Sequence, residues 1–381
     1  MDFGIPTEYR QIKALTRKFV AEVLRPVEEE VEETADVSDE LHARLVAESK
    51  RYGLWGAFAP ESLGGGGLTT LVPQTLVREE LGATSYVLRS YVDSGSPLRL
   101  ESATEYQREK FFMPAFRGEV RSFAAMTEPN AGTDNGAMET TARRDGDNWV
   151  INGTKHFISG VDHAAWGIVY AVTDPERRKH GGISGFIVEK GTPGFTVGRR
   201  QVMMGHRGFN QYVLHFDNCV VPHANMLGQE GTGLRQFLTS ITGARVKVAI
   251  EAVGSAQYAQ DLAVNYVKVR EVLGSVLAAK QGIQWMLVDS MMELQSARLI
   301  TYQAAWKADQ GEDFRVEASM AKAYATETAQ RVIDRAIQVH GGLGYCEELP
   351  LARLFRDIRG ARIYEGANEA QRYIISKAMF Q

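Results

Sequence analysis

The sequence predicts an α+β fold in which two helical regions flank a central region of short strands. Apolar residues recur at helical spacing in residues 1–117 and again in residues 229–381. Residues 118–228 instead alternate with a period of two and are interrupted by Gly, Asp and Pro at close intervals, which is typical of antiparallel strands. We therefore expect an N-terminal helical domain, a central antiparallel β domain and a C-terminal helical domain with these boundaries.

The N-terminal region predicts short helices. Ser38 can accept a hydrogen bond at the start of the segment DELHARLVAESKRY, and Gly53 provides a stop after it. A joint rich in glycine, PESLGGGG, separates this helix from the next one. The central region follows with five β-type runs, NWVINGTKHFISG, WGIVYAVT, GISGFIVEKG, GFTVG and YVLHFDNCVVP, which predict a small antiparallel sandwich or barrel.

The C-terminal region predicts long helices. In the segment EASMAKAYATETAQRVIDRAIQVHGG two neighbouring stripes run along one predicted helix, which ends at Gly341 and Gly342. The first stripe consists of Met320, Tyr324, Thr328, Val332 and Ala336, and the second of Ala329, Ile333 and Ile337. An order of helices, strands and helices suggests two helical domains that clasp a β domain.

The composition argues against several functional classes. The net charge is −4 and the sequence has no long run of Lys or Arg, so we expect no nucleic-acid partner. Two cysteines without CxxC spacing and eight histidines without an HExxH motif predict neither a disulfide framework nor a metal site. The N-terminus shows no signal or transit peptide, and no apolar window is long enough to span a membrane. We expect a bacterial cytoplasmic protein rather than a mitochondrial matrix protein.

One loop of the central region can hold a cofactor. The run MTEPNAGTDNGAM starts at Met126 and is tightened by Pro129 and Gly132, and it presents backbone N–H groups beside the hydroxyls of Thr127 and Thr133. These residues form either a polar connection between strands or a cradle for a flavin edge or a phosphate. The sequence pattern alone favours the plain connection.

A second candidate is the run GTKHFISG. Strict alternation places His156 and Ile158 on one face of a strand and Phe157 and Ser159 on the other. An aromatic ring and a hydroxyl on one face suit a planar cofactor, and the same pattern is equally that of a half-buried strand. The glycine-rich helix start at residues 230–234 is similarly either an anion site or a simple cap.

Two charged residues stand out in helical regions. Glu365 lies between Tyr364 and Gly366 in RIYEGANEAQRYII, where an amphipathic helix begins, so it is either a helix cap or a catalytic base. Arg89, in the run SYVLRSY, is either a solvated surface arginine or a partner for a carboxylate on a ligand. Local sequence leaves both alternatives open.

Five motifs occur in one order that resembles the acyl-CoA dehydrogenase family over nearly the whole chain. They are MTEPNAGTD, GTKHFISG, the set MGHRG, LHFDNCVVP and MLGQEGTG, then AIQVHGGLGY, and finally RDIRGARIYEGANEAQR. The resemblance implies a helical N-terminal domain, a β domain and a C-terminal four-helix bundle. It also implies FAD as the cofactor, an acyl-CoA substrate, an electron-transfer flavoprotein as electron acceptor, and a homotetramer or homodimer.

The resemblance also implies roles for individual residues. The family's base lies in the YEG motif, here Tyr364-Glu365-Gly366; a subset carries it just before the arginine that is Arg245 here, where this chain has Ala244. Glu365 is therefore the expected base. The FAD contacts implied are Met126, Thr127, Gly132, Thr133, Phe157, Ser159, Arg270, Gln338, Gly342, Ala367 and Glu369, with Gln338 and Gly342 reaching the FAD of a neighbouring subunit. The acyl-CoA contacts implied are Thr133, Arg89, Arg245, Tyr364 and Gly366, and Arg89 would suit a dicarboxylic or otherwise polar acyl group.

The chain departs from the family pattern at two places. The family's RxxFG segment is REVLG here, so that Leu273 replaces an aromatic residue between Arg270 and Gly274. Ala367 replaces the threonine that often follows YEG. One stacking contact and one hydroxyl to FAD are missing, so we expect a weaker or rearranged FAD site.

The activity implied is α,β-dehydrogenation of an acyl-CoA thioester to the trans-2-enoyl-CoA. Glu365 would take the α proton, and flavin N5 would accept the β hydride. The alternatives are an acyl-CoA oxidase, an enoyl-CoA reductase of the same fold, or a paralogue that has lost catalysis. Flavin monooxygenases of this fold generally lack the YEG carboxylate, and the DNA-binding branch carries an added basic region, so both fit this acidic chain less well.

Overall fold

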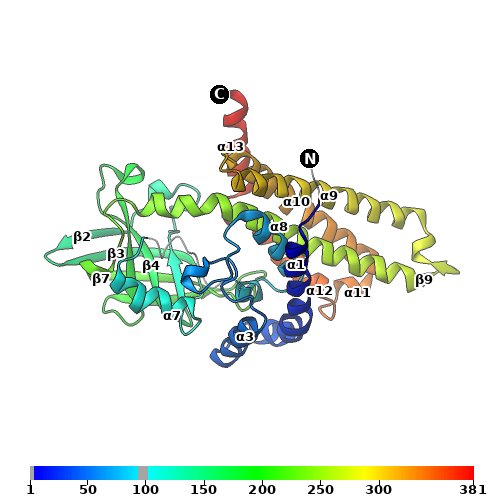
Figure 1. Cartoon of the computed structure of the whole chain (residues 1–381), viewed down its shortest axis with the longest axis horizontal. Helices are drawn as coiled ribbons and strands as arrows, with labels where there is room; N and C mark the ends of the chain where they lie inside the picture. The colour runs from blue at the N-terminus through cyan, green and yellow to red at the C-terminus, as the bar shows by residue number, and fades with distance from the viewer. Residues whose placement is uncertain (1–3, 93–101) are drawn as a thin grey trace.

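The structure, a computed structural model, describes residues 4–92 and 102–381 and confirms the order of helices, sheet and helices (Figure 1). The N-terminal helices pack around a core that includes Phe19, Leu45 and Leu88. The longer N-terminal elements are α1 (Thr7–Phe19), α2 (Glu28–Thr34), α3 (Asp39–Arg51) and α4 (Leu71–Leu81), and the short ones are α6 (Glu105–Gln107) and α7 (Met113–Phe116).

The predicted boundaries of the helix α3 are confirmed. The Ser38 hydroxyl accepts a hydrogen bond from the Leu41 N–H at 3.1 Å, which satisfies one of the free donors at the helix start. Gly53, just beyond the helix, has φ 68°, a backbone conformation that favours glycine. Local capping chemistry therefore sets both ends of this helix.

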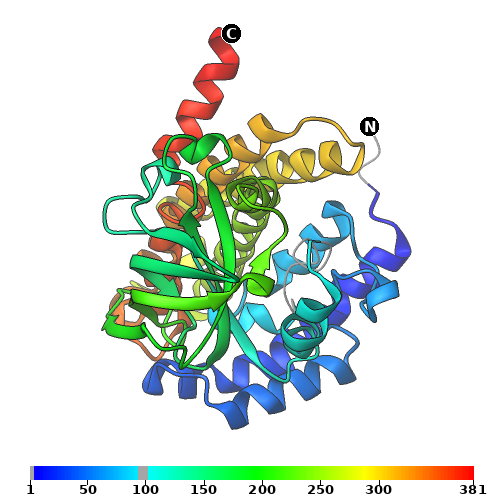
Figure 2. The same cartoon turned by 90° about the vertical axis from the view of Figure 1, so that its left-hand side faces the viewer.

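The central region forms one eight-stranded sheet, which confirms the expected β domain (Figure 2). The ring centroids of Trp149 and Phe186, from opposite halves of the sheet, lie 5.3 Å apart in a shared core, as expected of a sheet that curls into a sandwich or barrel. Its strands are β1 (Arg121–Ala125), β2 (Thr141–Asp145), β3 (Asn148–Ser159), β4 (Ala164–Val172), β5 (Ile183–Glu189), β6 (Phe195–Gln201), β7 (Gln211–Pro222) and β8 (Met226–Leu227). The strand order is β6-β7-β3-β2-β4-β5-β8, with β1 paired to β4. Most pairs are antiparallel, but β1 runs parallel to β4 because the intervening loop and the β2–β3 hairpin together make a crossover connection.

Long helices form the C-terminal part. These are α8 (Gly233–Val269), α9 (Gln281–Asp309), α10 (Arg315–His340), α11 (Gly342–Tyr345), α12 (Pro350–Ala361) and α13 (Asn368–Phe380), with a hairpin of β9 (Glu271–Val272) and β10 (Ser275–Val276) between α8 and α9. The helices α8, α9, α10 and α12 share an alanine-rich core. None of the described helices is long and apolar enough to cross a membrane.

The predicted stripe on α10 is only partly buried. Thr328, Val332 and Ala336 are buried, whereas Met320 and Tyr324 are exposed. Residues four apart are displaced by about 40° around a helix of 3.6 residues per turn, so a long stripe at that spacing winds off the buried face. Near the helix start the buried face is formed instead by small residues and one lysine, namely Ala318, Ala321, Lys322 and Ala325.

Candidate active site

Glu365 lies in the turn between α12 and α13 and has an unusual backbone. Its φ is 53° and that of Gly366 is 84°, so two consecutive residues are left-handed. A non-glycine residue pays about 1–2 kcal/mol for this conformation. The residue that caps α13 is Ala367, which makes no side-chain cap hydrogen bond. Glu365 is therefore not the helix cap, and its strained geometry is maintained by other contacts.

Three polar side chains hold this turn. Lys322, fully buried on α10, donates from Nζ to the Gly366 carbonyl oxygen at 2.8 Å and to Asn368 Oδ1 at 3.0 Å. Gln371 Nε2 donates to the same Gly366 oxygen at 2.8 Å. Asn368 in turn donates to Thr326 Oγ1 at 3.0 Å. The backbone of the turn is thus tied to α10 and to α13, which restricts where the Glu365 carboxyl can lie.

The carboxyl of Glu365 has an electrostatic setting that suits a base. Surrounding protein atoms desolvate it and raise its pKa, and the cations of Lys247, Lys322 and Arg245 partly oppose that shift. The side chain is nevertheless accessible to solvent. Both observations hold for a carboxyl that protein surrounds on most sides and that water still reaches. Burial also lowers the pKa of Lys322, to about 8.

Arg245, which the sequence predicts as a substrate contact, approaches the same region from α8. Burial lowers its pKa, and the negative charge of Glu365 opposes this. Its Nε is buried and has no hydrogen-bond partner among the described residues. A buried donor without an acceptor is costly in a finished structure and is expected where a ligand supplies the acceptor.

Tyr364 packs against two other aromatic side chains. The rings of Tyr86 and His206 stack at 3.9 Å, and each lies within 6 Å of the Tyr364 ring, at 5.7 and 5.6 Å. Asp357 on α12 accepts from the backbone N–H of His206 at 2.6 Å. A cavity of about 10 Å³, room for about one water, remains between these rings and Arg89.

Arg89 is not a surface residue. Its Nη2 donates to the Gly82 and Thr84 carbonyl oxygens at 3.2 and 3.1 Å and to Ser255 Oγ at 2.9 Å. Its Nη1 lies 3.6 Å from a carboxylate oxygen of buried Glu251. The solvated alternative is therefore wrong. Arg89 links the segment that follows α4 to α8, and it lines the small cavity beside Tyr364. Its role in substrate binding stays a prediction.

The loop after β1 is held by a buried ion pair. Lys155 Nζ donates to Glu128 Oε1 at 2.7 Å and to the Met126 carbonyl oxygen at 3.1 Å. Glu128 also accepts from the backbone N–H of Thr140 at 3.0 Å. The Thr127 carbonyl oxygen accepts from the His156 N–H at 2.8 Å, which fixes the loop against β3. Thr127 and the start of this loop are thus rigidly placed beside Phe157.

Phe157 departs from the strict alternation expected of β3. It has φ 58° at a register irregularity between Lys155 and Ile158, and its side chain is 53% exposed. An exposed aromatic ring held by a bulge, next to loop donors and to Ser159, presents a flat apolar face with polar atoms at its edge. Gly132 and Thr133 are exposed at the other end of the loop, and a Cβ at Gly132 would meet no atom within 4 Å. These features fit a planar cofactor such as a flavin.

The loop between β6 and β7 connects the two groups of site residues. Gln201, at the end of β6, accepts from the Phe157 N–H at 3.0 Å and contacts His156 at 2.7 Å. Five residues later His206 packs against Tyr364. The cofactor candidates on β3 and the turn of Glu365 are therefore bridged by one short segment.

Three predicted FAD residues lie far from this site. Arg270 follows α8, while Gln338 and Gly342 lie at the end of α10, and all three are exposed. The 37 residues of α8 span about 55 Å between the β sheet and this end of the molecule (Figure 1). Leu273, in the hairpin at the same end, is 93% exposed with φ 50°. One chain cannot bring both groups to a single cofactor.

Sequence reasoning missed Lys322, Tyr86, His206 and Asp357. His206 stands in the quoted motif MGHRG, but nothing in its spacing indicates a contact with Tyr364. Lys322 carries a signal that could have been used, because a lysine between Ala318, Ala321 and Ala325 sits on a face of small residues where burial is expected. A buried lysine needs polar partners, and here they are the residues of the Glu365 turn.

Family models match all three parts of the chain. They are described as acyl-CoA dehydrogenase N-terminal, middle and C-terminal domains and match residues 6–119, 124–219 and 231–380. The chain belongs to the acyl-CoA dehydrogenase family. It is 34% identical to the short-chain specific acyl-CoA dehydrogenase of Clostridium acetobutylicum, with 100% of both sequences covered. It is 36% identical to the acryloyl-CoA reductase (NADH) of Anaerotignum propionicum, over 100% of this chain and 96% of that protein.

Solved structures agree with this assignment. Butyryl-CoA dehydrogenase from Megasphaera elsdenii is 35% identical and superposes with a TM-score of 0.90, and the match covers 100% of both chains. The structure of PigA with FAD and proline is 27% identical with a TM-score of 0.90, covering 100% of this chain and 99% of that one. The fold predicted for this acyl-CoA dehydrogenase family member is confirmed, and relatives of it bind FAD.

Proposed function

We propose that this chain oxidises a short acyl-CoA between Cα and Cβ to the trans-2-enoyl-CoA, with Glu365 as the base that removes the α proton. The observation that carries the proposal is the setting of Glu365, a carboxyl with a raised pKa in a left-handed turn tied to two helices. A base works best when its pKa approaches the working pH, and burial moves the pKa of this group in that direction.

The residues around Glu365 serve orientation and charge balance. The cations of Lys247, Lys322 and Arg245 oppose the rise of the Glu365 pKa and so favour its ionised form. The buried Nε of Arg245 is free to donate to the acyl-CoA. Tyr364, packed on Tyr86 and His206, gives one wall to the acyl group. The α proton then moves to a Glu365 oxygen.

FAD would be held by Met126, Thr127, Gly132, Thr133, Phe157, Ser159, Ala367 and Glu369 of one chain, with Arg270, Gln338 and Gly342 supplied by a second copy. When bound, FAD supplies the hydride acceptor for Cβ. The distance of about 55 Å along α8 supports a contribution from another copy. With Leu273 in place of an aromatic residue, we expect weaker FAD binding.

A homotetramer, or at least a homodimer, fits the exposed surface of α9. Trp285, Met292, Leu299 and Trp306 follow each other at seven-residue spacing and are all exposed. Seven-residue spacing places large apolar side chains along one seam of a helix. A seam of two tryptophans and two aliphatic residues is an exposed apolar surface of the kind that marks an interface, and the occupant we propose is α9 of another copy.

The electron acceptor proposed is an electron-transfer flavoprotein, and the compartment expected is the bacterial cytoplasm. A second candidate is reduction of a 2-enoyl-CoA, which the similarity to an acryloyl-CoA reductase favours. In that direction the same Glu365 carboxyl, in its protonated form, would deliver the α proton. Rapid reoxidation of the reduced enzyme by air would instead indicate an oxidase.

Anaerobic bleaching of the bound flavin with a panel of acyl-CoAs tests the function and the substrate class. Short straight-chain acyl-CoAs are expected to bleach the flavin faster than branched, aromatic or long ones. If Arg89 binds a distal carboxylate, a dicarboxylyl-CoA will bleach the flavin as fast as a short acyl-CoA does. Arg89→Met will then lose bleaching by the dicarboxylyl-CoA and keep bleaching by the short acyl-CoA. No bleaching with any of these thioesters by an FAD-loaded protein would contradict the proposal. A protein that cannot be loaded with FAD would support the paralogue that has lost catalysis.

A further inference from the structure

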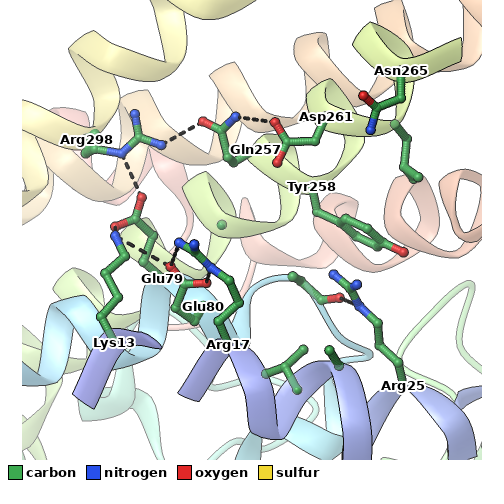
Figure 3. A pocket seen from close by; sticks show the side chains of 15 residues that line it. Lys13, Arg17, Arg25, Glu79, Glu80, Gln257, Tyr258, Asp261, Asn265 and Arg298 are labelled. Atoms are coloured by element: carbon green, nitrogen blue, oxygen red, sulfur yellow. Dashed lines mark hydrogen bonds and ion pairs between the residues drawn. The ribbon is translucent and has the colours of Figure 1, made fainter. Parts of the chain in front are cut away.

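A cavity of about 710 Å³ lies between the N-terminal helices and the helices α8 and α9 (Figure 3). We call it the α1–α8 cavity. Lys13 and Arg17 of α1 and Arg25 line one side, and Gln257, Tyr258 and Asp261 of α8 line the other. Its volume is that of a small-molecule site, and none of the predicted active-site residues lines it.

Three of the four cations in the α1–α8 cavity are paired with carboxylates. Lys13 and Arg298 each lie 2.7 Å from Glu79, and Arg17 lies 2.8 Å from Glu80. These pairs tie α1 and α9 to α4 and leave the carboxylates fully used. The cavity therefore has a rigid wall of neutralised charge on this side (Figure 3).

Among the described residues, Arg25 is the cation of the α1–α8 cavity that is not paired with a carboxylate. Its Nε donates to the Ala83 carbonyl oxygen at 3.3 Å, and its guanidinium carbon lies 3.9 Å above the ring of Tyr258. It makes no ion pair with a described carboxylate. The guanidinium of Arg25 is half-buried and lies over an aromatic ring. The N–H groups of its Nη1 and Nη2 can therefore donate to an external acceptor.

The chain places Arg25 there by breaking the first helix. After α1 the backbone passes through a π turn, Val20–Leu24, and a 3₁₀ turn, Arg25–Val27. Pro26 lacks an N–H group, so a regular α-helix cannot run through this point with all its hydrogen bonds. The break directs Arg25 toward Tyr258 of α8 instead of along the surface of α1 (Figure 3).

The opposite wall offers an acceptor. Gln257 Oε1 accepts from Arg298 at 2.8 Å, and its Nε2 donates to Asp261 Oδ1 at 2.9 Å. This chain of hydrogen bonds orients Asp261, three residues after Tyr258 and therefore on the same face of α8. The α1–α8 cavity thus presents a cation on an aromatic platform and a carboxylate one helical turn away.

We propose that the α1–α8 cavity binds a small organic oxyanion, whose carboxylate or phosphate pairs with the terminal nitrogens of Arg25 and whose hydroxyl or amine donors face Asp261. This site goes beyond the proposed dehydrogenation and does not depend on it. A ligand that bridges the first helical segment and α8 also stabilises the folded protein by mass action.

The test uses the FAD-loaded protein with two probes, inorganic phosphate and succinate, at constant ionic strength. Binding is measured by ³¹P line broadening for phosphate and by isothermal titration for succinate. In Arg25→Gln, affinity should fall by about tenfold or more, because a charge-assisted pair is lost. In the control Arg17→Gln, which removes a mainly exposed cation already paired with Glu80, affinity should change less than about twofold.

The two probes separate the sources of the oxyanion. Arg25-dependent binding of phosphate alone supports a phosphate-bearing ligand, and Arg25-dependent binding of succinate alone supports a carboxylate. Binding that is equal in the parent and in Arg25→Gln, or no binding of either probe to the parent, overturns the proposal. If Arg25→Gln does not fold, Arg25→Lys provides the second variant, because it keeps the charge but loses the planar guanidinium. Succinate and phosphate affinities in Arg25→Lys that equal those of the parent then overturn the paired geometry.

Discussion

The turn that carries Glu365 can be perturbed without touching the carboxyl. In Gly366→Ala the alanine must adopt a φ of 84°, and its Cβ would lie 2.8 Å from Gln371 Nε2. The left-handed backbone costs about 1–2 kcal/mol, and displacement of the Gln371 amide loses a hydrogen bond of about 1 kcal/mol. We expect a fall of about 2–3 kcal/mol in the free energy of unfolding. A shift of the base by about 1 Å should lower kcat by roughly a hundredfold.

The control for this change is Gly191→Ala. Gly191 lies between β5 and β6 with φ 90°, and its Cβ would meet no atom within 4 Å. It pays the same backbone penalty of about 1–2 kcal/mol and should leave kcat unchanged. Urea unfolding gives the stability of both variants, and steady-state turnover with butyryl-CoA gives kcat. Equal losses of stability with kcat retained in both variants would refute the claim that this turn positions Glu365.

Three further predictions follow from buried charges and from the exposed seam. Burial lowers the pKa of Lys322 from 10.5 to about 8, so between these pH values the unfolded chain binds one more proton than the folded chain. Lys322 therefore makes the free energy of unfolding rise with pH in this range. Lys322→Met should remove that rise, as measured by urea unfolding at a series of pH values. Arg89→Met leaves Glu251 with one fewer cation, and it removes the side-chain donor to the Thr84 carbonyl oxygen and to Ser255 Oγ, so the free energy of unfolding should fall by roughly 3–5 kcal/mol. Met292→Glu places a charge in the α9 seam and should yield a smaller assembly by light scattering.

The sequence predicts those features that depend on neighbours along the chain. The order of helices, strands and helices follows from the two apolar periods, and the ends of α3 follow from Ser38 and Gly53. The parallel pairing of β1 with β4 was missed because register between distant strands leaves no local signal. The bulge at Phe157 was missed for the same reason, since strict alternation contains no information about an inserted residue.

In the candidate site, too, the sequence predicts features that depend on neighbouring residues and misses those that depend on distant packing. The resemblance of YEG to a family motif singles out Glu365. Its left-handed backbone, and the hydrogen bond from Lys322 to the carbonyl oxygen of Gly366, 44 positions later in the chain, depend on the packing of α10 against the turn. Arg89 was noticed from its position, while its burial against Ser255 and Glu251 depends on the crossing of α4 and α8. Gly254 makes that crossing close, because a Cβ there would lie 1.9 Å from the Glu79 carbonyl oxygen.

The central claim is that Glu365 removes the α proton, and Glu365→Gln tests it most directly. The amide keeps the size of the side chain and removes its basicity. We predict that FAD-loaded Glu365→Gln binds butyryl-CoA but bleaches its flavin anaerobically at least about a hundredfold more slowly than the parent. Bleaching as fast as that of the parent would contradict the assignment of Glu365 as the base.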